Sequence, residues 1–339
     1  MKKMLRAIFS VVILCVVYSY APAQTGRSKI EISAPKSYKA PDLTPSDELE
    51  TMLKDAVAAV LDPANGKGFK PEEIAATLID VRDPSGLKWA NVAGEKPIYP
   101  ASVVKMFYMA ALERQLEDGK VALTPELERG LKDMIVDSSN EATQYILDVL
   151  TDTSSGAELP QKQFEKWQYQ RNRVNRFFAS MGYTNSNINQ KTFCEDAYGI
   201  EQQSRKYKGQ NRNMITTNAT ARLLAEIVLG RMNTSQRTQR MMDLMKRDPS
   251  AASSDPDNQA VGFTGRALID AKLTGARLWS KAGWTSKSRH DAAYIETPEG
   301  MKFVLVIYTE NHANDRDAIP SIAGKILQRL KGTASQNKF

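Results

Sequence analysis

The chain has 339 residues, of which 42% are hydrophobic and 25% charged, with 19 Gly and 15 Pro. This composition is that of a globular protein and excludes a largely disordered, collagen-like or fibrous one. Two Cys exclude a disulfide scaffold, and two His make a zinc site of the usual type unexpected. Any chemistry should therefore come from Ser, Lys, Tyr and carboxylate side chains.

The first 23 residues have the features of an export signal peptide. A basic start precedes an apolar run at 7–20, and a cleavage signal of the A-x-A type ends at Ala23. The run is short for a membrane span, and no polybasic segment follows it. We therefore expect an exported protein, periplasmic or secreted, without a stable membrane anchor after cleavage. Cleavage would remove the charges of Lys2, Lys3 and Arg6 and lower the formal net charge from +7 to +4, too small an excess to indicate nucleic-acid binding.

The next segments predict a lead, a helix and two strands. Residues 24–45 are rich in Pro, Ser and Lys without periodicity, which predicts a flexible lead. Ser46 is expected to cap a helix whose apolar residues follow helical spacing. Two strand-like runs, IAATLIDVRD and LKWANVAGEKPIY, lie on either side of a turn at 84–86, and a second helix is predicted from about 101 to 118.

The middle of the chain, about 107–224, is almost entirely helical in pattern. Thr124 is the expected cap of a helix at 125–137, and another helix is predicted at 217–230. Residues 151–170 have the character of a polar insertion. Residues 184–213 lack periodicity, and an irregular run of this length inside a domain is usually functional.

Three further strand-like runs, RLWSKAGW, AAYIETP and KFVLVIYTE, precede a last helix at about 320–330. The short connections between these runs imply antiparallel pairing. We therefore expect an α+β fold with a five-stranded antiparallel sheet, built from both ends of the chain and flanked by terminal helices. The catalytic domain would span 46–335, with the helical subdomain at about 107–224 inserted between the second and third strands.

The first candidate motif is Ser102-Val-Val-Lys105, at the start of the second predicted helix. The spacing places both side chains on one helical face, with Cβ atoms about 5–6 Å apart. A lysine whose pKa is depressed can take the proton of a serine hydroxyl, and backbone N–H groups at the helix start can stabilise an oxyanion. The pattern alone is weak, because Ser335 and Lys338 match it in the C-terminal tail. The position of Ser102 after two strands and before an apolar helix distinguishes it.

The second candidate motif is Ser138-Ser139-Asn140. One interpretation is structural, with Ser138 and Glu141 forming a capping box for a helix at 140–150. The functional interpretation is a second hydroxyl that relays protons and an amide that orients Lys105 and a substrate carbonyl.

The third candidate motif is Lys281-Ala282-Gly283, inside the first of the three later strands. A glycine in a strand often marks the close approach of a ligand or of another backbone segment. Lys281 would supply positive charge for a substrate carboxylate, although a solvated strand lysine is the simpler reading.

Together the three motifs, in this order, resemble those of the class A serine β-lactamases, in the penicillin-recognising serine enzyme superfamily. The resemblance covers roughly residues 46–331, apart from an insertion near 151–172. It implies β-lactamase/transpeptidase-like architecture and hydrolysis of β-lactams through a serine acyl-enzyme, without metal or organic cofactor. It also implies a monomer whose partner is a small β-lactam or a peptidoglycan-like substrate.

The resemblance gives each catalytic motif residue a role. Ser102 would be the acylated nucleophile, and Lys105 its general base or proton shuttle. Ser138 would deliver the proton to the leaving nitrogen, and Asn140 would bind the substrate amide.

The resemblance also gives roles to the third motif. Lys281 would hold the substrate carboxylate, with Arg289 on the next strand as a further candidate. The backbone N–H groups of Ser102 and of Trp284, which follows Gly283, would form the oxyanion hole.

Two departures from the family pattern concern turnover and binding. The deacylating glutamate of the family lies in an E-x-x-L-N motif, which 184–213 lacks. Counting places Thr192 near the expected position, and Glu195 is the nearest carboxylate, so either Glu195 serves or no residue activates the deacylating water. Ala282 stands where a hydroxyl residue is usual, which removes one hydrogen bond to a carboxylate. Cys194 is expected to be a small core residue.

Other activities stay open at this point. The same scaffold would suit a D-alanyl-D-alanine carboxypeptidase or a related serine esterase or amidase. The missing glutamate motif would suit a penicillin-binding protein that is acylated without turnover. A Ser-His-Asp triad using His290 or His312 has no G-x-S-x-G motif to support it.

Overall fold

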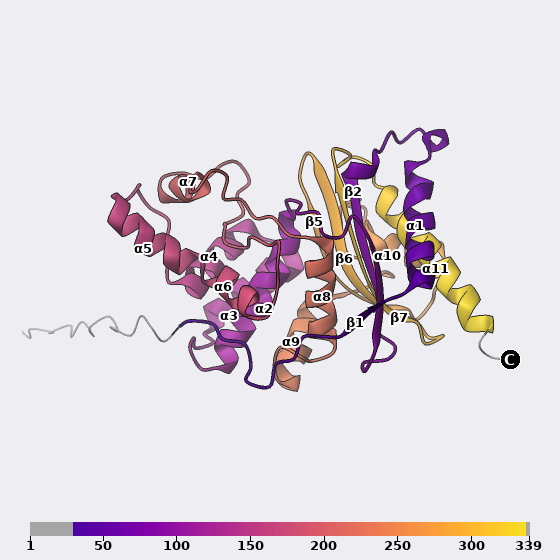
Figure 1. Cartoon of the computed structure of the whole chain (residues 1–339), viewed down its shortest axis with the longest axis horizontal. Coiled ribbons are helices and arrows are strands. Elements are labelled where there is room, and N and C mark those ends of the chain that lie inside the picture. Colours follow the sequence, from indigo (N-terminus) through magenta and orange to yellow (C-terminus); the bar gives the residue numbers. More distant parts are fainter. Residues whose placement is uncertain (1–29, 337–339) are drawn as a thin grey trace, which may run out of the picture.

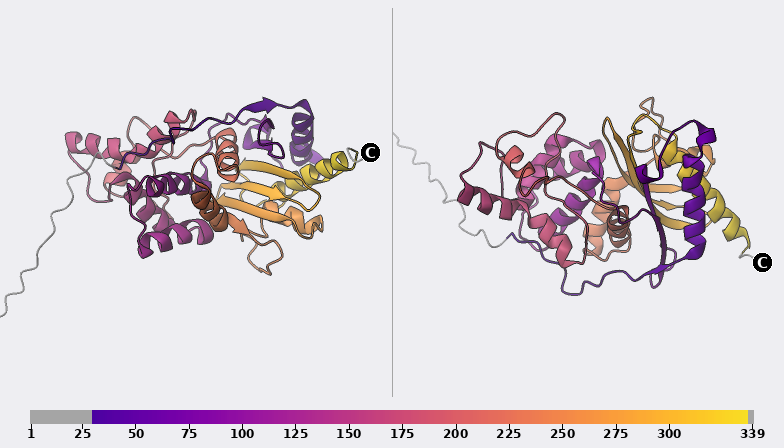
Figure 2. Two further views of the ribbon diagram at one scale, coloured as in Figure 1. Left: turned by 90° about the horizontal axis from the view of Figure 1, so that it is seen from below. Right: turned by 45° about the horizontal axis from the view of Figure 1, so that its top comes forward.

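A sheet stands between two layers of helices, and segments from both ends of the chain contribute to it (Figure 1). The computed structural model describes residues 30–336, so the signal peptide predicted at 1–23 lies outside the described residues. One face of the sheet packs against α1 (Asp47–Leu61), α10 (Thr264–Asp270) and α11 (Ala318–Gln336). The other face packs against α8 (Thr217–Val228), and the rest of the helical subdomain lies beyond it (Figure 2). The predicted α+β fold is confirmed.

The sheet has seven strands, so the prediction of five is wrong in number. Its order is β1 (Leu43–Pro45), β3 (Leu87–Val92), β2 (Ile74–Asp80), β7 (Lys302–Glu310), β6 (Ser288–Glu296), β5 (Arg277–Trp284) and β4 (Lys246–Arg247). The five inner strands pair in antiparallel fashion as predicted. The two additional strands lie at the edges, and β1 pairs with β3 in parallel. They have three and two residues, too few to show an alternating pattern.

The segment between β3 and β4 is mainly helical. Its helices are α2 (Val104–Glu117), α3 (Pro125–Lys132), α4 (Asn140–Thr151), α5 (Gln161–Arg171), α6 (Arg173–Ser180), α7 (Ile200–Arg205) and α8, and α9 (Ser235–Met245) follows them. The polar insertion at 151–170 ends in α5. The aperiodic segment at 184–213 is irregular apart from α7.

The alternating side chains of the inner strands build a separate core on each face of the sheet. On β7, Val304 and Val306 pack with the helical subdomain, whereas Leu305 and Ile307 pack with α1 and α11. Both cores are apolar, because both faces of the sheet are covered by helices. The six consecutive residues Phe303 to Tyr308 are therefore all hydrophobic, instead of alternating with polar residues.

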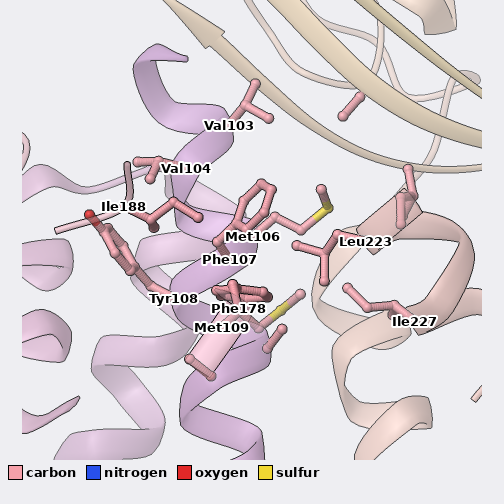
Figure 3. Packing of buried hydrophobic residues seen from close by; sticks show 14 of the residues in the cluster. Val103, Val104, Met106, Phe107, Tyr108, Met109, Phe178, Ile188, Leu223 and Ile227 are labelled. Atoms are coloured by element: carbon pink, nitrogen blue, oxygen red, sulfur yellow. The ribbon is translucent and has the colours of Figure 1, made fainter. Parts of the chain in front are cut away.

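Helix α2 runs through the centre of the helical subdomain and is buried on all sides. Figure 3 shows its apolar side chains, including Met106 and Phe107, packed with Phe178 of α6 and with Leu223 and Ile227 of α8. Burial of each large apolar side chain contributes about 1.5–3 kcal/mol, so this helix is rigidly held. Within residues 101–110 only Ser102 is not buried, so this residue is partly accessible just before the start of the helix.

Residues 30–45, the described part of the lead, pack against the rest of the protein, whereas the sequence predicted a flexible segment. The Glu31 carboxylate pairs with Arg173 and Arg176 of α6, and Ile32 is buried in the core. The lead then crosses to the sheet, where it forms β1 (Figure 2). The polar composition of this segment predicts exposure, but its few charged and apolar side chains anchor it to the helical subdomain.

Candidate active site

Ser102 lies on a 3-10 turn, Ala101–Val103, that joins the sheet to α2. Ala101 has a φ of 46°, a left-handed conformation that costs a non-glycine residue about 1–3 kcal/mol. The turn packs directly against β5, because a Cβ added to Gly283 would lie 2.6 Å from the Ser102 backbone nitrogen. Only glycine fits there, so the close approach expected for Gly283 is a contact with the Ser102 backbone. Trp284 is the next residue on β5 and is partly exposed.

Lys105 is fully buried in the first turn of α2, where its amine contacts the second motif. Its Nζ donates to the Ser138 carbonyl at 2.5 Å, lies 3.3 Å from Ser138 Oγ, and donates to Asn140 Oδ1 at 2.9 Å. Burial lowers the pKa of Lys105 to about 7, although Glu141 and Cys194 act in the opposite direction. A lysine with this pKa is a proton acceptor near neutral pH.

Ser138 is not the helix cap that the capping-box interpretation expected. Ser139 caps α4 instead, and its Oγ accepts from the Ala142 backbone N–H at 3.0 Å. Ser138 has a φ of 60° and directs its hydroxyl toward two lysines. Its Oγ lies 3.3 Å from Lys105 Nζ and 3.0 Å from Lys281 Nζ. The hydroxyl thus connects the first and third motifs.

Lys281 lies on β5 and is fully buried rather than solvated. Besides Ser138 Oγ, its Nζ contacts Gln259 Oε1 at 2.8 Å and the Ala282 carbonyl at 2.9 Å. Burial lowers the pKa of Lys281 well below its usual range, and the positive charges of Lys105 and Arg247 act in the same direction. The structure therefore brings Lys105, Ser138, Asn140 and Lys281 together in one hydrogen-bonded group at the junction of the helical subdomain and the sheet. Ser102 lies three residues before Lys105, with its backbone against Gly283.

Arg289, the further candidate for binding a substrate carboxylate, is engaged elsewhere. It lies on β6, where its Nη1 pairs with Asp257 Oδ1 at 2.6 Å and its Nη2 donates to the Gly262 carbonyl at 2.9 Å. Its guanidinium also stacks on the Phe263 ring. The sequence predicted the correct strand for this residue, but its guanidinium pairs with Asp257 and Gly262 of the loop that precedes α10.

The loop at 184–213 presents a thiol, not a carboxylate, to the candidate site. Cys194 is exposed, so its prediction as a core residue is wrong, and its Sγ accepts from Asn140 Nδ2 at 3.4 Å. The Thr192 carbonyl accepts from Gln144 Nε2 of α4 at 3.2 Å, and the buried Thr192 Oγ1 has no partner.

Glu195 is exposed on the same loop. Within residues 30–336, no hydrogen bond or ion pair joins its carboxylate to Ser102, Lys105 or Asn140. Glu195 is thus adjacent to Cys194 but has no polar link to these candidate residues.

A buried ionic cluster holds this loop against the helical subdomain. Arg171 of α5 donates to both carboxylate oxygens of Glu201, at 2.7 and 2.8 Å. Lys191 pairs with Asp148 of α4 at 2.6 Å and with Glu201 at 3.3 Å. Burial raises the pKa of Glu201, but Arg171 and Lys191 outweigh this effect and lower it overall. Arg171, the last residue of α5, thus supplies the cation that holds the loop in place.

Neither histidine takes part in the candidate site. His290 is fully buried, with Nδ1 accepting from the Thr309 N–H and Nε2 facing the Tyr99 carbonyl, and burial lowers its pKa to about 4. His312 pairs with Glu73 instead. Lysine is therefore the available base. Among the described residues, no cluster of three His, Cys, Asp or Glu side chains is arranged to hold a metal ion, and no helix has the length and apolar character to cross a membrane.

Sequence reasoning missed Gln259, whose amide lies against Lys281. The residue belongs to the segment between β4 and α10, which has no periodicity and no motif. No feature of the sequence connects it to a lysine 22 positions later on a strand.

Comparisons with known proteins bear on the family and the fold. A model described as the beta-lactamase enzyme family matches residues 124–330, more than half of the chain. No curated protein sequence matches.

Among solved structures, a beta-lactamase from Sphaerobacter thermophilus has 20% identity and a TM-score of 0.57, over 84% of this chain and 98% of that one. PBP-A has 17% identity and a TM-score of 0.58, over 87% of this chain and 100% of that one. The TLA-1 extended-spectrum beta-lactamase has 14% identity and a TM-score of 0.58, over 83% and 99%. At these identities the likeness is one of fold. The family match and the shared fold together show that this chain belongs to the beta-lactamase enzyme family, among the penicillin-recognising serine enzymes.

Proposed function

We propose that this protein is an exported, class A-like serine β-lactamase in which deacylation, not acylation, limits turnover. The observation that carries this proposal is the position of Ser138 Oγ between the amines of Lys105 and Lys281. This arrangement suits the transfer of a proton from the nucleophile to a leaving nitrogen.

In the acylation step, Ser102 Oγ attacks the lactam carbonyl carbon while Lys105 accepts the hydroxyl proton. The backbone N–H groups of Ser102 and Trp284 stabilise the oxyanion. The carbon–nitrogen bond of the lactam then breaks, and Ser138 delivers a proton to the nitrogen, which Lys105 replenishes. The product is an ester on Ser102, with the opened ring still attached.

In the deacylation step a water must be activated. The loop at 184–213 has no carboxylate hydrogen-bonded to the candidate residues that could do this. In class A β-lactamases the loop motif supplies a carboxylate, whereas Cys194 is the loop side chain that contacts Asn140 here. Of the candidate catalytic residues, Lys105 is then the base that would activate the water. We expect the ester to accumulate before it is hydrolysed.

The test is the time course of ring opening with benzylpenicillin in excess. We expect a rapid burst of about one equivalent of opened ring per protein, followed by a slow linear phase. Ser102→Ala should show neither phase. A linear time course from the start would contradict rate-limiting deacylation.

Glu195→Gln is expected to leave the slow phase within about twofold of the wild-type rate, because the Glu195 carboxylate is exposed and forms no hydrogen bond or ion pair with the described site residues. The measurement is the steady-state rate of benzylpenicillin hydrolysis in both proteins. A loss of tenfold or more would instead assign water activation to Glu195, through a loop rearrangement in the acyl-enzyme.

A second candidate function is a penicillin-binding protein that is acylated without turnover. The contact between Cys194 and Asn140 favours this function, because the loop side chain at this position is a thiol and not a carboxylate. A burst with no linear phase would support this function. Release of D-alanine from a peptide ending in D-alanyl-D-alanine would support a carboxypeptidase.

A further inference from the structure

Gln259 lies at the end of the site where a carboxylate would meet Lys281. Its Oε1 accepts from Lys281 Nζ at 2.8 Å and from the Ala282 backbone N–H at 3.2 Å. Its Nε2 donates to the Val136 carbonyl at 3.0 Å, two residues before Ser138. Because two donors converge on one side of the amide, its oxygen must face Lys281.

The amine of Lys281 has no position left for a substrate. Its three contacts, with Ser138 Oγ, Gln259 Oε1 and the Ala282 carbonyl, equal the three N–H donors of a lysine ammonium group. The side chain is also fully buried. A carboxylate can therefore reach this amine only if Gln259 gives up its hydrogen bonds.

The second cation at this end of the sheet is covered by the same loop. Asp257, two residues before Gln259, pairs with Arg289 and also with Arg316. Its carboxylate accepts a hydrogen bond from Nη1 of Arg289, and the Arg289 side chain is buried. One loop thus supplies an acceptor to each of the two cations that a substrate carboxylate would use.

We propose that Gln259 determines specificity by occupying the carboxylate position at Lys281, so that the site favours acyl donors that are uncharged at this end. A side-chain amide satisfies Lys281 without adding a negative charge, and Ala282 offers a backbone N–H but no hydroxyl to help a competing carboxylate. This inference rests on the proposed acylation of Ser102 and concerns the preferred class of acyl donor.

The test compares two donors that differ only at the carboxylate, benzylpenicillin and its methyl ester. The readout is the ratio of the second-order rate constants for acylation of Ser102, ester over acid, from quenched samples by intact mass. In the wild-type protein this ratio should exceed one.

Two substitutions should move the ratio in opposite directions. Gln259→Met keeps the volume and removes the acceptor, which frees Lys281 and should lower the ratio about tenfold, as expected for a hydrogen bond to a charged group. Gln259→Glu places a carboxylate on Lys281 and should raise the ratio by a similar factor.

Gln203→Met is the matched control. Its amide is also bonded on both sides, to the backbone N–H and carbonyl of Leu159, away from Lys281. Its ratio should equal that of the wild type.

Two results would overturn the inference while leaving the proposed function intact. One is an unchanged ratio in both Gln259 variants. The other is an equal loss of both rates in Gln259→Met, which would make Gln259 a positioning residue for Lys281. If neither donor modifies Ser102 in any of the proteins, the proposed function fails, and the inference fails with it.

Discussion

Replacing Lys105 with methionine should lower the rate constant for acylation of Ser102 by benzylpenicillin about a thousandfold, within the usual range for loss of a general base. Methionine fills the buried volume but cannot accept the Ser102 proton. It also removes the amine that contacts Ser138 Oγ and Asn140 Oδ1. The measurement is the growth of the adduct by intact mass. Lys162→Met, an exposed lysine on α5, is the control and should react like the wild type.

The same base sets the pH dependence of acylation. Because the pKa of Lys105 is lowered to about 7, the free amine is the major form above that pH and the protonated form below it. The rate constant should therefore rise about tenfold per pH unit below 7 and level off above it. Glu141 and Cys194 favour the charged amine, but the burial of Lys105 outweighs them. A profile that is flat between pH 5 and 9 would exclude Lys105 as the base.

Arg171→Met should lower the free energy of unfolding by about 3–5 kcal/mol, the usual cost of removing one partner from a buried ion pair. Arg171 is fully buried, and its removal leaves Glu201 with Lys191 at 3.3 Å as its remaining cation. Denaturant unfolding measures the effect. Because Glu201 anchors the loop at 184–213, limited proteolysis should also cut this loop faster than in the wild type.

The exposed pair of Arg129 and Glu126 provides a control for this prediction. Both side chains are more than half exposed, so Arg129→Met should leave the unfolding midpoint nearly unchanged. If Arg171→Met proves as stable as this control, the ionic cluster is not what holds the loop.

The parts of the fold and site that could be predicted depend on short-range patterns. The Ser102–Lys105 spacing is local, and the strand that carries Lys281 has a clear hydrophobic pattern. The two edge strands escaped prediction because strands of two or three residues carry no periodicity. The sequence suggested Ser138 as the cap, whereas Ser139 caps α4 because the Ser138 hydroxyl contacts the lysines instead.

The features that could not be predicted depend on contacts between residues far apart in the sequence. The engagement of Arg289 depends on Asp257, and that of Lys281 on Gln259, both from an aperiodic loop that tertiary packing places. The exposure of Cys194 depends on how the ionic cluster of Arg171 holds its loop. None of these pairings follows from the spacing of residues along the chain.

The most direct test of the account is the site of covalent attachment of benzylpenicillin. Quenched samples should show an adduct of one penicillin mass, and peptide mapping should place it on Ser102. Ser102→Ala should show no adduct under the same conditions. An adduct on any other residue, or its persistence in Ser102→Ala, would contradict the assignment of Ser102 as the nucleophile.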